Sequence, residues 1–301
     1  MPAAGFELAT VSVRGLDRDA IWKNLVLPAV IPAALRAGLR IVDQFRPDIV
    51  LGMGGYVMAP AVAAARMRGI PYVLHEKDVR PGLATRLFAG AAAAVCTTLP
   101  GTERRIPARR VVLTGVPLRD GFEPRTPSVP PRHLLITGGS QGARNLNQVV
   151  WAGLDGLCQR FDEVVHVAGR QGAQGVARHS RLCYRGHAFV DDMASLMGSA
   201  DLVVSRAGVG TIAEATAVGL PMVLVPGTFG GGHQEENAAA MVEAGAAVSI
   251  GDAKLTPESL VSTIDGLTAE RLRAMAKASA AAGHRDAAQR VLGVLREVVS
   301  G

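Results

Sequence analysis

Short runs of apolar residues, each followed by a turn rich in glycine or polar residues, recur along this chain. Such runs are typical of buried parallel strands, and the stretches between them have the spacing of helices that cover a sheet. This alternation predicts an α/β fold. The predicted strands are residues 6–13, 48–53, 71–74, 91–96, 111–114, 133–137, 163–167, 186–192, 202–205 and 222–225.

The stretch Leu202–Pro226 shows this pattern most clearly. An apolar strand, Leu202–Ser205, runs into a turn with two glycines, Arg206–Gly210. A short helix, Thr211–Val218, follows and is ended by Gly219 before a second apolar strand. In a βαβ unit such a turn directs backbone N–H groups and the positive end of a helix at one point, which suits a phosphate.

Two interpretations of Thr211 and Glu214 remain open at this point. Their spacing matches a capping box, in which the two side chains only secure the start of the helix. The same spacing also places a hydroxyl and a carboxylate beside the proposed phosphate position. Spacing alone favours the capping box slightly, so a binding role needs support from elsewhere in the chain.

A second glycine-rich turn, Gly138–Asn145, follows the strand at 133–137. Its sequence, GGSQGARN, matches neither the GxGxxG pattern of dinucleotide-binding domains nor the GxxxxGK[ST] pattern of P-loop NTPases, so neither class is supported. In the first half of the chain, the charged tetrapeptide His75–Asp78 follows a predicted strand. Open α/β sheets bind ligands at the carboxyl ends of their strands, which favours a functional role over a solvated loop.

The clearest break in composition is Gly115–Arg132, which contains five prolines and is the best candidate for a linker. Both halves have α/β patterns, which predicts two Rossmann-like domains that face each other across a cleft. The helical stretch Ile21–Leu39 contains charged residues and two prolines and is not expected to cross a bilayer. Ile21, Trp22, Leu25 and Val26 form an apolar group near basic residues; such a group can rest on an anionic membrane, although core packing is the commoner explanation.

Composition narrows the chemistry only modestly. Apolar residues make up 49% of the chain and aromatic residues 4%, so the cores are expected to be aliphatic. The net charge of +6 favours anionic partners, but without a run of consecutive basic residues nucleic acid is not implied. The three cysteines, Cys96, Cys158 and Cys183, form no CxxC, so neither a disulfide framework nor a zinc site is expected, and a reducing cytoplasm is the default compartment.

Several ordered motifs resemble those of the MurG family, the GT-B transferases that add N-acetylglucosamine to lipid I. The resemblance runs along nearly the whole chain, and GGSQGAR-x-LN is its most specific motif. The motifs are GMGGYV (52–57), HE (75–76), GGSQGARNLN (138–147), FVDDM (189–193), RAGVGTIAE (206–214) and HQEEN (233–237).

The resemblance implies that the second domain, residues 119–285, binds the UDP-sugar donor, while residues 1–118 and a final helix at about 286–301 form the acceptor domain. Phe189 and Val190 would flank the uracil, and Glu214 would accept both ribose hydroxyls. The turn at 209–211, with Ser140 and Arg119, would hold the diphosphate. The implied donor-binding residues are Arg119, Ser140, Gln141, Phe189, Val190, Val209, Gly210, Thr211, Glu214, His233, Gln234 and Asn237.

The resemblance also implies the reaction: inverting, metal-independent transfer from UDP-GlcNAc to the muramyl sugar of lipid I, giving lipid II, without a cofactor. The first domain would dock on the anionic cytoplasmic leaflet as a peripheral protein, through the group at Ile21, Trp22, Leu25 and Val26. His75 and Glu76 are the candidate catalytic residues. The candidate acceptor-side residues are Gly54, Gly55, Tyr56, His75, Glu76 and Asp78.

Three departures from the family pattern affect the first domain. The N-terminal strand and GGTGGH loop, about 30 residues with a histidine proposed as the base, are not found, so this domain is expected to be N-terminally incomplete. HEQN is replaced by His75–Asp78 (HEKD), and GNP by Gly115–Pro117 (GVP). Donor binding is therefore predicted to be intact, whereas turnover is in question. The alternatives are a related UDP-sugar transferase with another acceptor, or a non-catalytic UDP-sugar-binding remnant or subunit.

Overall fold

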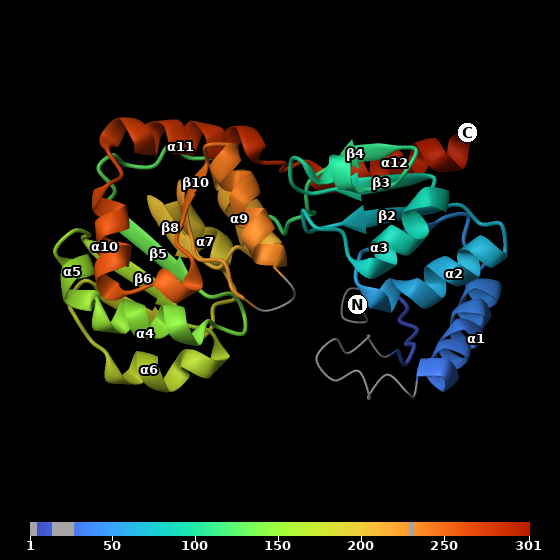
Figure 1. Cartoon of the computed structure of the whole chain (residues 1–301), viewed down its shortest axis with the longest axis horizontal. Coiled ribbons are helices and arrows are strands. Elements are labelled where there is room, and N and C mark those ends of the chain that lie inside the picture. Colours follow the sequence, from blue (N-terminus) through green and yellow to red (C-terminus); the bar gives the residue numbers. More distant parts are fainter. Residues whose placement is uncertain (1–4, 14–26, 229–231) are drawn as a thin grey trace.

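The computed structural model describes residues 5–13, 27–228 and 232–301. It shows two α/β domains side by side, the first coloured blue to teal and the second green to orange (Figure 1). The apolar group at Ile21, Trp22, Leu25 and Val26 lies outside the described residues. Among the helices that are described, none is both long enough and apolar enough to cross a membrane.

The first domain is built on four parallel strands that pair in chain order, β1-β2-β3-β4. β2 and β3 are buried along their whole length because helices cover both faces of the sheet. The strands are β1 (Val50–Gly52), β2 (Tyr72–Glu76), β3 (Ala94–Thr97) and β4 (Val111–Leu113). The helices are α1 (Leu27–Phe45), α2 (Ala59–Met67) and α3 (Leu83–Phe88).

The last helix of the chain, α12 (Ala287–Ser300), packs on the sheet of the first domain (Figure 1). Val291 and Val294 form one buried cluster with Val73 and Cys96 of β2 and β3. The chain therefore crosses between the domains twice, once near Gly115 and once before α12.

The second domain has six parallel strands in the order β10-β9-β8-β5-β6-β7. The strand order reverses between the neighbours β5 and β8, and such a switch point leaves a crevice at the carboxyl ends of the strands. The strands are β5 (His133–Thr137), β6 (Glu163–Val167), β7 (Tyr184–His187), β8 (Leu202–Ser205), β9 (Met222–Leu224) and β10 (Ala247–Ser249). The helices are α4 (Arg144–Ala152), α5 (Leu154–Cys158), α6 (Ala173–Arg178), α7 (Met193–Ser199), α8 (Val209–Val218), α9 (His233–Glu243), α10 (Pro257–Asp265) and α11 (Ala269–Ala282).

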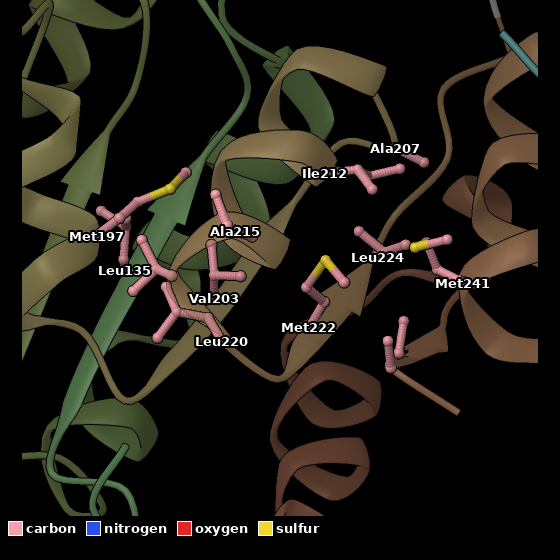
Figure 2. Close-up of a cluster of buried hydrophobic side chains, with 14 of the residues drawn as sticks. Leu135, Met197, Val203, Ala207, Ile212, Ala215, Leu220, Met222, Leu224 and Met241 are labelled. Atoms are coloured by element: carbon pink, nitrogen blue, oxygen red, sulfur yellow. The ribbon is translucent and has the colours of Figure 1, made fainter. Parts of the chain in front are cut away.

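Two buried hydrophobic clusters lie between the six-stranded sheet and its helices, one on each face of the sheet. Figure 2 shows part of one of them, in which Leu135 and Val203 lie beside Met197 and Leu220. The same cluster includes Val79 and Leu99 of the first domain. The core of the second domain therefore extends across the boundary between the domains.

The structure corrects three local predictions. Residues 6–13 do not form a strand, and Phe6 and Leu8 are 66% and 59% exposed. The helix expected after the Gly138 turn is divided at Gly153 into α4 and α5. α8 begins at Val209, with Gly208 at its N-cap and no side-chain cap bond, so the capping-box interpretation of Thr211 and Glu214 is wrong.

The prediction of no disulfide framework is also wrong, because Cys158 and Cys183 form a disulfide with their Cα atoms 5.8 Å apart. Cys96 is a free, buried cysteine. The two bonded residues are 25 positions apart and match no spacing motif. They meet because α5 leads into β6, and β6 pairs with β7, which Cys183 precedes.

Candidate functional site

A hollow of about 360 Å³ lies at the carboxyl ends of β5, β6 and β8, where the strand order reverses. Most of its walls come from the turns that follow these strands, as expected for an open α/β sheet. The lining residues are Arg119, Thr137, Gly139, Ser140, Val167, Gly169, Phe189, Val190, Met193, Gly210, Thr211 and Glu214.

Two glycine-containing turns form the floor of this hollow by direct backbone contact. Gly142 and Gly169 both have positive φ angles, 81° and 78°. A Cβ atom on Gly142 would lie 2.3 Å from the Ala168 carbonyl oxygen, and one on Gly169 would lie 2.2 Å from the Gly142 nitrogen. Any side chain at either position would separate the turns, so the glycines are required by this close approach.

The first turn of α8 forms another wall, since Gly210 and Thr211 both line the hollow. The free N–H groups and positive dipole of a helix start favour an anion there. Glu214 lies one turn further along α8 and also lines the hollow. Burial raises the pKa of the Glu214 carboxyl above its ordinary value, and the positive charge of Arg119 opposes this rise.

The rim of the hollow carries an exposed aromatic ring and two arginines. Phe189 is 46% exposed, and the guanidinium carbon of Arg170 lies 5.4 Å from the centre of its ring. An exposed ring next to a polar hollow offers a surface on which a planar base can stack. Arg119 reaches the rim from the linker, where its Nη1 donates to the Asp191 carbonyl oxygen at 3.4 Å.

Asp252, which the sequence analysis did not single out, joins the two glycine-rich turns. Its Oδ1 accepts hydrogen bonds from Arg206 Nη1 at 2.7 Å and from Asn145 Nδ2 at 3.0 Å. Burial opposes ionisation of this carboxyl, but the bonds from Asn145 and Arg206 outweigh burial and lower its pKa. Arg206 and Asn145 belong to the two motifs that flank the hollow, so Asp252 fixes these motifs relative to each other.

Other residues predicted to bind the donor do not line this hollow. Gln141 is exposed beside it, and Val209 is buried in the core below α8. In α9, the Gln234 Oε1 atom accepts from the Gly227 N–H at 2.8 Å, and His233 Nδ1 lies 3.2 Å from the Arg80 carbonyl oxygen. Asn237 is fully buried, and its side chain bonds to Val79, Asp78 and Ala207.

The structure places His75 and Glu76 inside β2, whereas the sequence had placed them after the strand. His75 is 0% exposed, and its Nε2 shares a hydrogen bond with the Gly115 carbonyl oxygen at 2.8 Å. Burial lowers the pKa of His75, and the bond to Gly115 acts in the opposite direction. Since a carbonyl only accepts, Nε2 carries the proton, and Nδ1 has no partner among the described residues.

Glu76 holds the loop that follows β2. Its Oε1 accepts from the N–H groups of Lys77 and Asp78 at 3.0 and 3.3 Å, and its Oε2 accepts from the Gly82 N–H at 3.1 Å. The Glu76 side chain is buried, so its carboxylate is occupied by backbone groups.

A second hollow, of about 310 Å³, lies on the first domain between α1, α2 and α3, and its walls are almost entirely apolar. Tyr56, one of the predicted acceptor-side residues, lies on its wall and is 53% exposed. Gly54 and Gly55 precede it in a turn with φ angles of 79° and 71°. The lining residues are Val13, Val30, Ile31, Ala34, Leu35, Tyr56, Ala59, Pro60, Ala63, Leu83, Ala84, Leu87 and Phe88.

Two Rossmann-like domains, with a hollow suited to a nucleotide at the strand ends of the second, give this protein the architecture of the GT-B class. The chain belongs to glycosyltransferase family 28: residues 1–97 match the N-terminal domain of the family and residues 133–291 match its C-terminal domain. This assignment confirms the resemblance found in the sequence.

The most similar relatives found carry one name, UDP-N-acetylglucosamine--N-acetylmuramyl-(pentapeptide) pyrophosphoryl-undecaprenol N-acetylglucosamine transferase. The protein of this name from Nocardioides sp. is 38% identical over 100% of this chain and 86% of its own length. That from Frankia casuarinae is 37% identical over 100% of this chain and 84% of its own length. The crystal structure of Acinetobacter baumannii MurG superposes with a TM-score of 0.81 at 26% identity, covering 98% of this chain and 86% of that one.

Proposed function

We propose that this protein transfers N-acetylglucosamine from UDP-N-acetylglucosamine to the muramyl sugar of lipid I in peptidoglycan synthesis. The observation that carries the proposal is the hollow at the β5–β8 switch point, in which Glu214, the α8 N-terminus and an exposed aromatic ring lie together. The relatives whose names describe this reaction match the chain over its whole length. In this proposal a single displacement by the acceptor hydroxyl inverts the configuration at the anomeric carbon.

In this proposal the donor lies along the hollow, with its base at Phe189 and Val190 and its ribose at Glu214. A carboxylate has two oxygens and can accept a hydrogen bond from each of two adjacent hydroxyls. The diphosphate then lies at Ser140 and the first turn of α8. This order follows from the lining residues, because the aromatic rim, the carboxylate and the helix start are the groups that suit a base, a ribose and an anion in turn.

The chemical step is a displacement in which the oxygen of the acceptor hydroxyl forms a bond to the anomeric carbon, the bond from that carbon to the diphosphate oxygen breaks, and the hydroxyl proton is released to water. Negative charge develops on the leaving diphosphate. Arg119 and the N-terminus of α8 stabilise that charge, so the leaving group is held by the protein in place of a metal ion. The pKa of His75 is lowered and its Nδ1 is unprotonated, but its complete burial keeps it away from an acceptor hydroxyl.

Replacement of Glu214, the proposed ribose ligand, tests the donor assignment directly. Glu214→Ala should weaken UDP binding about 100-fold in calorimetry, since two hydrogen bonds to a charged acceptor are lost at roughly 1.5 kcal/mol each. Glu243→Ala, an exposed carboxylate on α9, is the matched control and should leave the affinity unchanged. Unchanged UDP affinity in Glu214→Ala would contradict the proposed orientation of the donor.

We also propose that the apolar hollow of the first domain rests on the anionic cytoplasmic leaflet, where it receives the lipid part of the acceptor. Ile31, Leu83 and Leu87 are each more than half exposed at its edge. Apolar surface of this kind is typical of sites that contact lipid or another protein. Arg86 on α3 and Arg36 on α1 are exposed near these residues in the chain and add attraction to anionic headgroups.

Vesicle sedimentation tests the membrane proposal. Leu87→Glu should reduce binding to vesicles that contain phosphatidylglycerol by about tenfold, because a charge replaces a large apolar group at the contact. Leu182→Glu, which changes an exposed leucine of the second domain, should have no effect. Equal binding by the two variants would show that the hollow does not contact the membrane.

A further inference from the structure

Two residues of the first domain, Val79 in the loop after β2 and Leu99 after β3, enter the core of the second domain. Val79, in this loop, is 5% exposed and belongs to the hydrophobic cluster built around β8, β9 and α8. The neighbouring polar contacts lie on α9, which Figure 1 shows on the side of the second domain that faces the first. At the loop after β2, apolar and polar contacts together join the two domains.

Asn237 on α9 is the centre of these polar contacts. Its Oδ1 accepts from the Val79 N–H at 3.0 Å, and its Nδ2 donates to Asp78 Oδ1 at 2.9 Å and to the Ala207 carbonyl oxygen at 3.2 Å. Both amide hydrogens are therefore in use, and the side chain is fully buried. Because the side chain is fully buried, a sugar hydroxyl could reach this amide only if the protein groups around it moved.

Through its three partners, Asn237 connects a loop of the first domain with the turn that precedes α8 in the second. Asp78 and Val79 lie in the loop that the Glu76 carboxylate fixes. Ala207 belongs to the turn that leads into α8, whose first residues line the donor hollow. The position of the first domain and the shape of the turn that faces the diphosphate are therefore tied to one side chain.

We propose that Asn237 and Asp78 are positioning residues. Their hydrogen bond holds the two domains at the separation that the transfer step requires, and the bond from Asn237 to the Ala207 carbonyl oxygen fixes the turn before α8. The role predicted for Asn237 from the sequence, a contact with the donor sugar, is replaced by this one. Asp78, predicted from the sequence to lie on the acceptor side, bonds to Asn237 and through it supports the turn at Ala207 beside the donor hollow. The inference uses the proposed function only for its kinetic measurements.

The test measures the domain separation directly, without substrate. Spin labels at Met67→Cys on α2 and Glu270→Cys on α11, both exposed, report the distance between the domains by pulsed electron paramagnetic resonance. Asn237→Asp should broaden the distance distribution and lengthen its mean, because two carboxylates then face each other and the Ala207 carbonyl loses its donor. The same variant should lower kcat at least tenfold, with a smaller change in UDP affinity.

The conservative and reciprocal changes distinguish positioning from a general loss of stability. Asp78→Asn keeps an oxygen that can accept from Asn237 and should retain a narrow distribution and most of kcat. The double variant Asp78→Asn with Asn237→Asp restores a donor and an acceptor at this pair and should recover part of both. Glu243→Gln, which changes an exposed carboxylate at the end of α9, is the control and should change neither measurement.

Two results would overturn the proposal. The first is a distance distribution and a kcat in Asn237→Asp that match those of the unmodified protein. The second is a loss of UDP-N-acetylglucosamine affinity, but not of UDP affinity, with an unchanged distribution; Asn237 would then contact the sugar. The distance measurement separates failure here from failure of the proposed function, since it needs neither donor nor acceptor.

Discussion

The two domains present similar strand ends but use them differently. In the second domain, the turns after β5, β6 and β8 open into a hollow whose polar side chains face inward. In the first, the equivalent edge beyond β2 is closed: His75 bonds to the Gly115 carbonyl and Glu76 to three backbone N–H groups. The hollow of the first domain lies instead between helices and is apolar.

This difference shows that charged residues at a strand end do not by themselves make a site. Glu76 and Glu214 are both carboxylates near the ends of parallel sheets. The oxygens of Glu76 are satisfied by backbone amides. Burial raises the pKa of Glu214, whose carboxyl lines the hollow and bonds to no backbone group among the described residues. A carboxylate that is desolvated and open to a ligand is the one available for binding.

The largest expected effect comes from Glu76→Ala. Three partly buried N–H groups would lose their acceptor at roughly 1 kcal/mol each, so the free energy of unfolding should fall by about 3 kcal/mol in urea titrations. UDP affinity should change little, because the donor hollow belongs to the other domain. Glu103→Ala, an exposed carboxylate of the first domain, serves as the control. A variant with normal stability and no turnover would instead make Glu76 catalytic.

The two buried histidines, one in each domain, should make the protein less stable at pH 5 than at pH 7. Burial lowers the pKa of His75, and it lowers the pKa of His166 to about 4. The unfolded chain binds protons below pH about 6.5 while the folded one does not, so stability is lost as the pH falls from there towards 4. For His166 the loss should be about 2 kcal/mol at pH 5. His166→Gln should flatten the pH dependence of urea unfolding, and an unchanged slope would contradict this account.

Glu214→Gln should separate binding from stability. The amide keeps one carbonyl acceptor for a ribose hydroxyl, so UDP affinity should fall about tenfold, less than in Glu214→Ala. Because burial raises the pKa of Glu214, its ionised form is disfavoured in the folded state at neutral pH. The donor-free variant should therefore unfold at a higher temperature at pH 7, and this gain should vanish below about pH 4.5. Lower thermal stability at pH 7 would mean that Glu214 is a structural residue.

The smallest effects should come from two neighbouring residues in one turn. Ser140 lines the donor hollow and Gln141 does not. Ser140→Ala should weaken UDP binding about fivefold through the loss of one hydroxyl, and Gln141→Ala should change it less than twofold. Calorimetry on the pair tests how sharply the hollow ends at this turn. The reverse order would place the diphosphate on the outer side of the turn.

The apolar pattern predicted most of the second domain. β5, β6 and β8 occur at the predicted residues, and Gly219 ends α8 with a φ angle of 89°. These elements are local: a buried strand needs a run of apolar residues, and a left-handed helix end needs a glycine. The motif at 206–214 also indicated the family, which the comparisons confirm.

The sequence did not predict features that depend on partners far away in the chain. Phe6 and Leu8 alternate with polar residues as in a strand, yet no neighbouring strand pairs with them in the described part of the chain. The Cys158–Cys183 disulfide and the role of Asp252 depend on which turns the sheet brings together. The spacing of residues along the chain does not show which distant residues become neighbours in the fold.

The sequence by itself determined the α/β class, the two glycine-rich turns and the kinship with glycosyltransferases, because each depends on residues that are close in the chain. Only the tertiary structure decided what the polar side chains do. Glu214 lines a hollow, Glu76 holds a loop, and Asn237 bridges two domains to a residue 159 positions away. The physical reason is that burial and hydrogen-bond partners, which set the chemistry of a carboxylate or an amide, are properties of the folded arrangement.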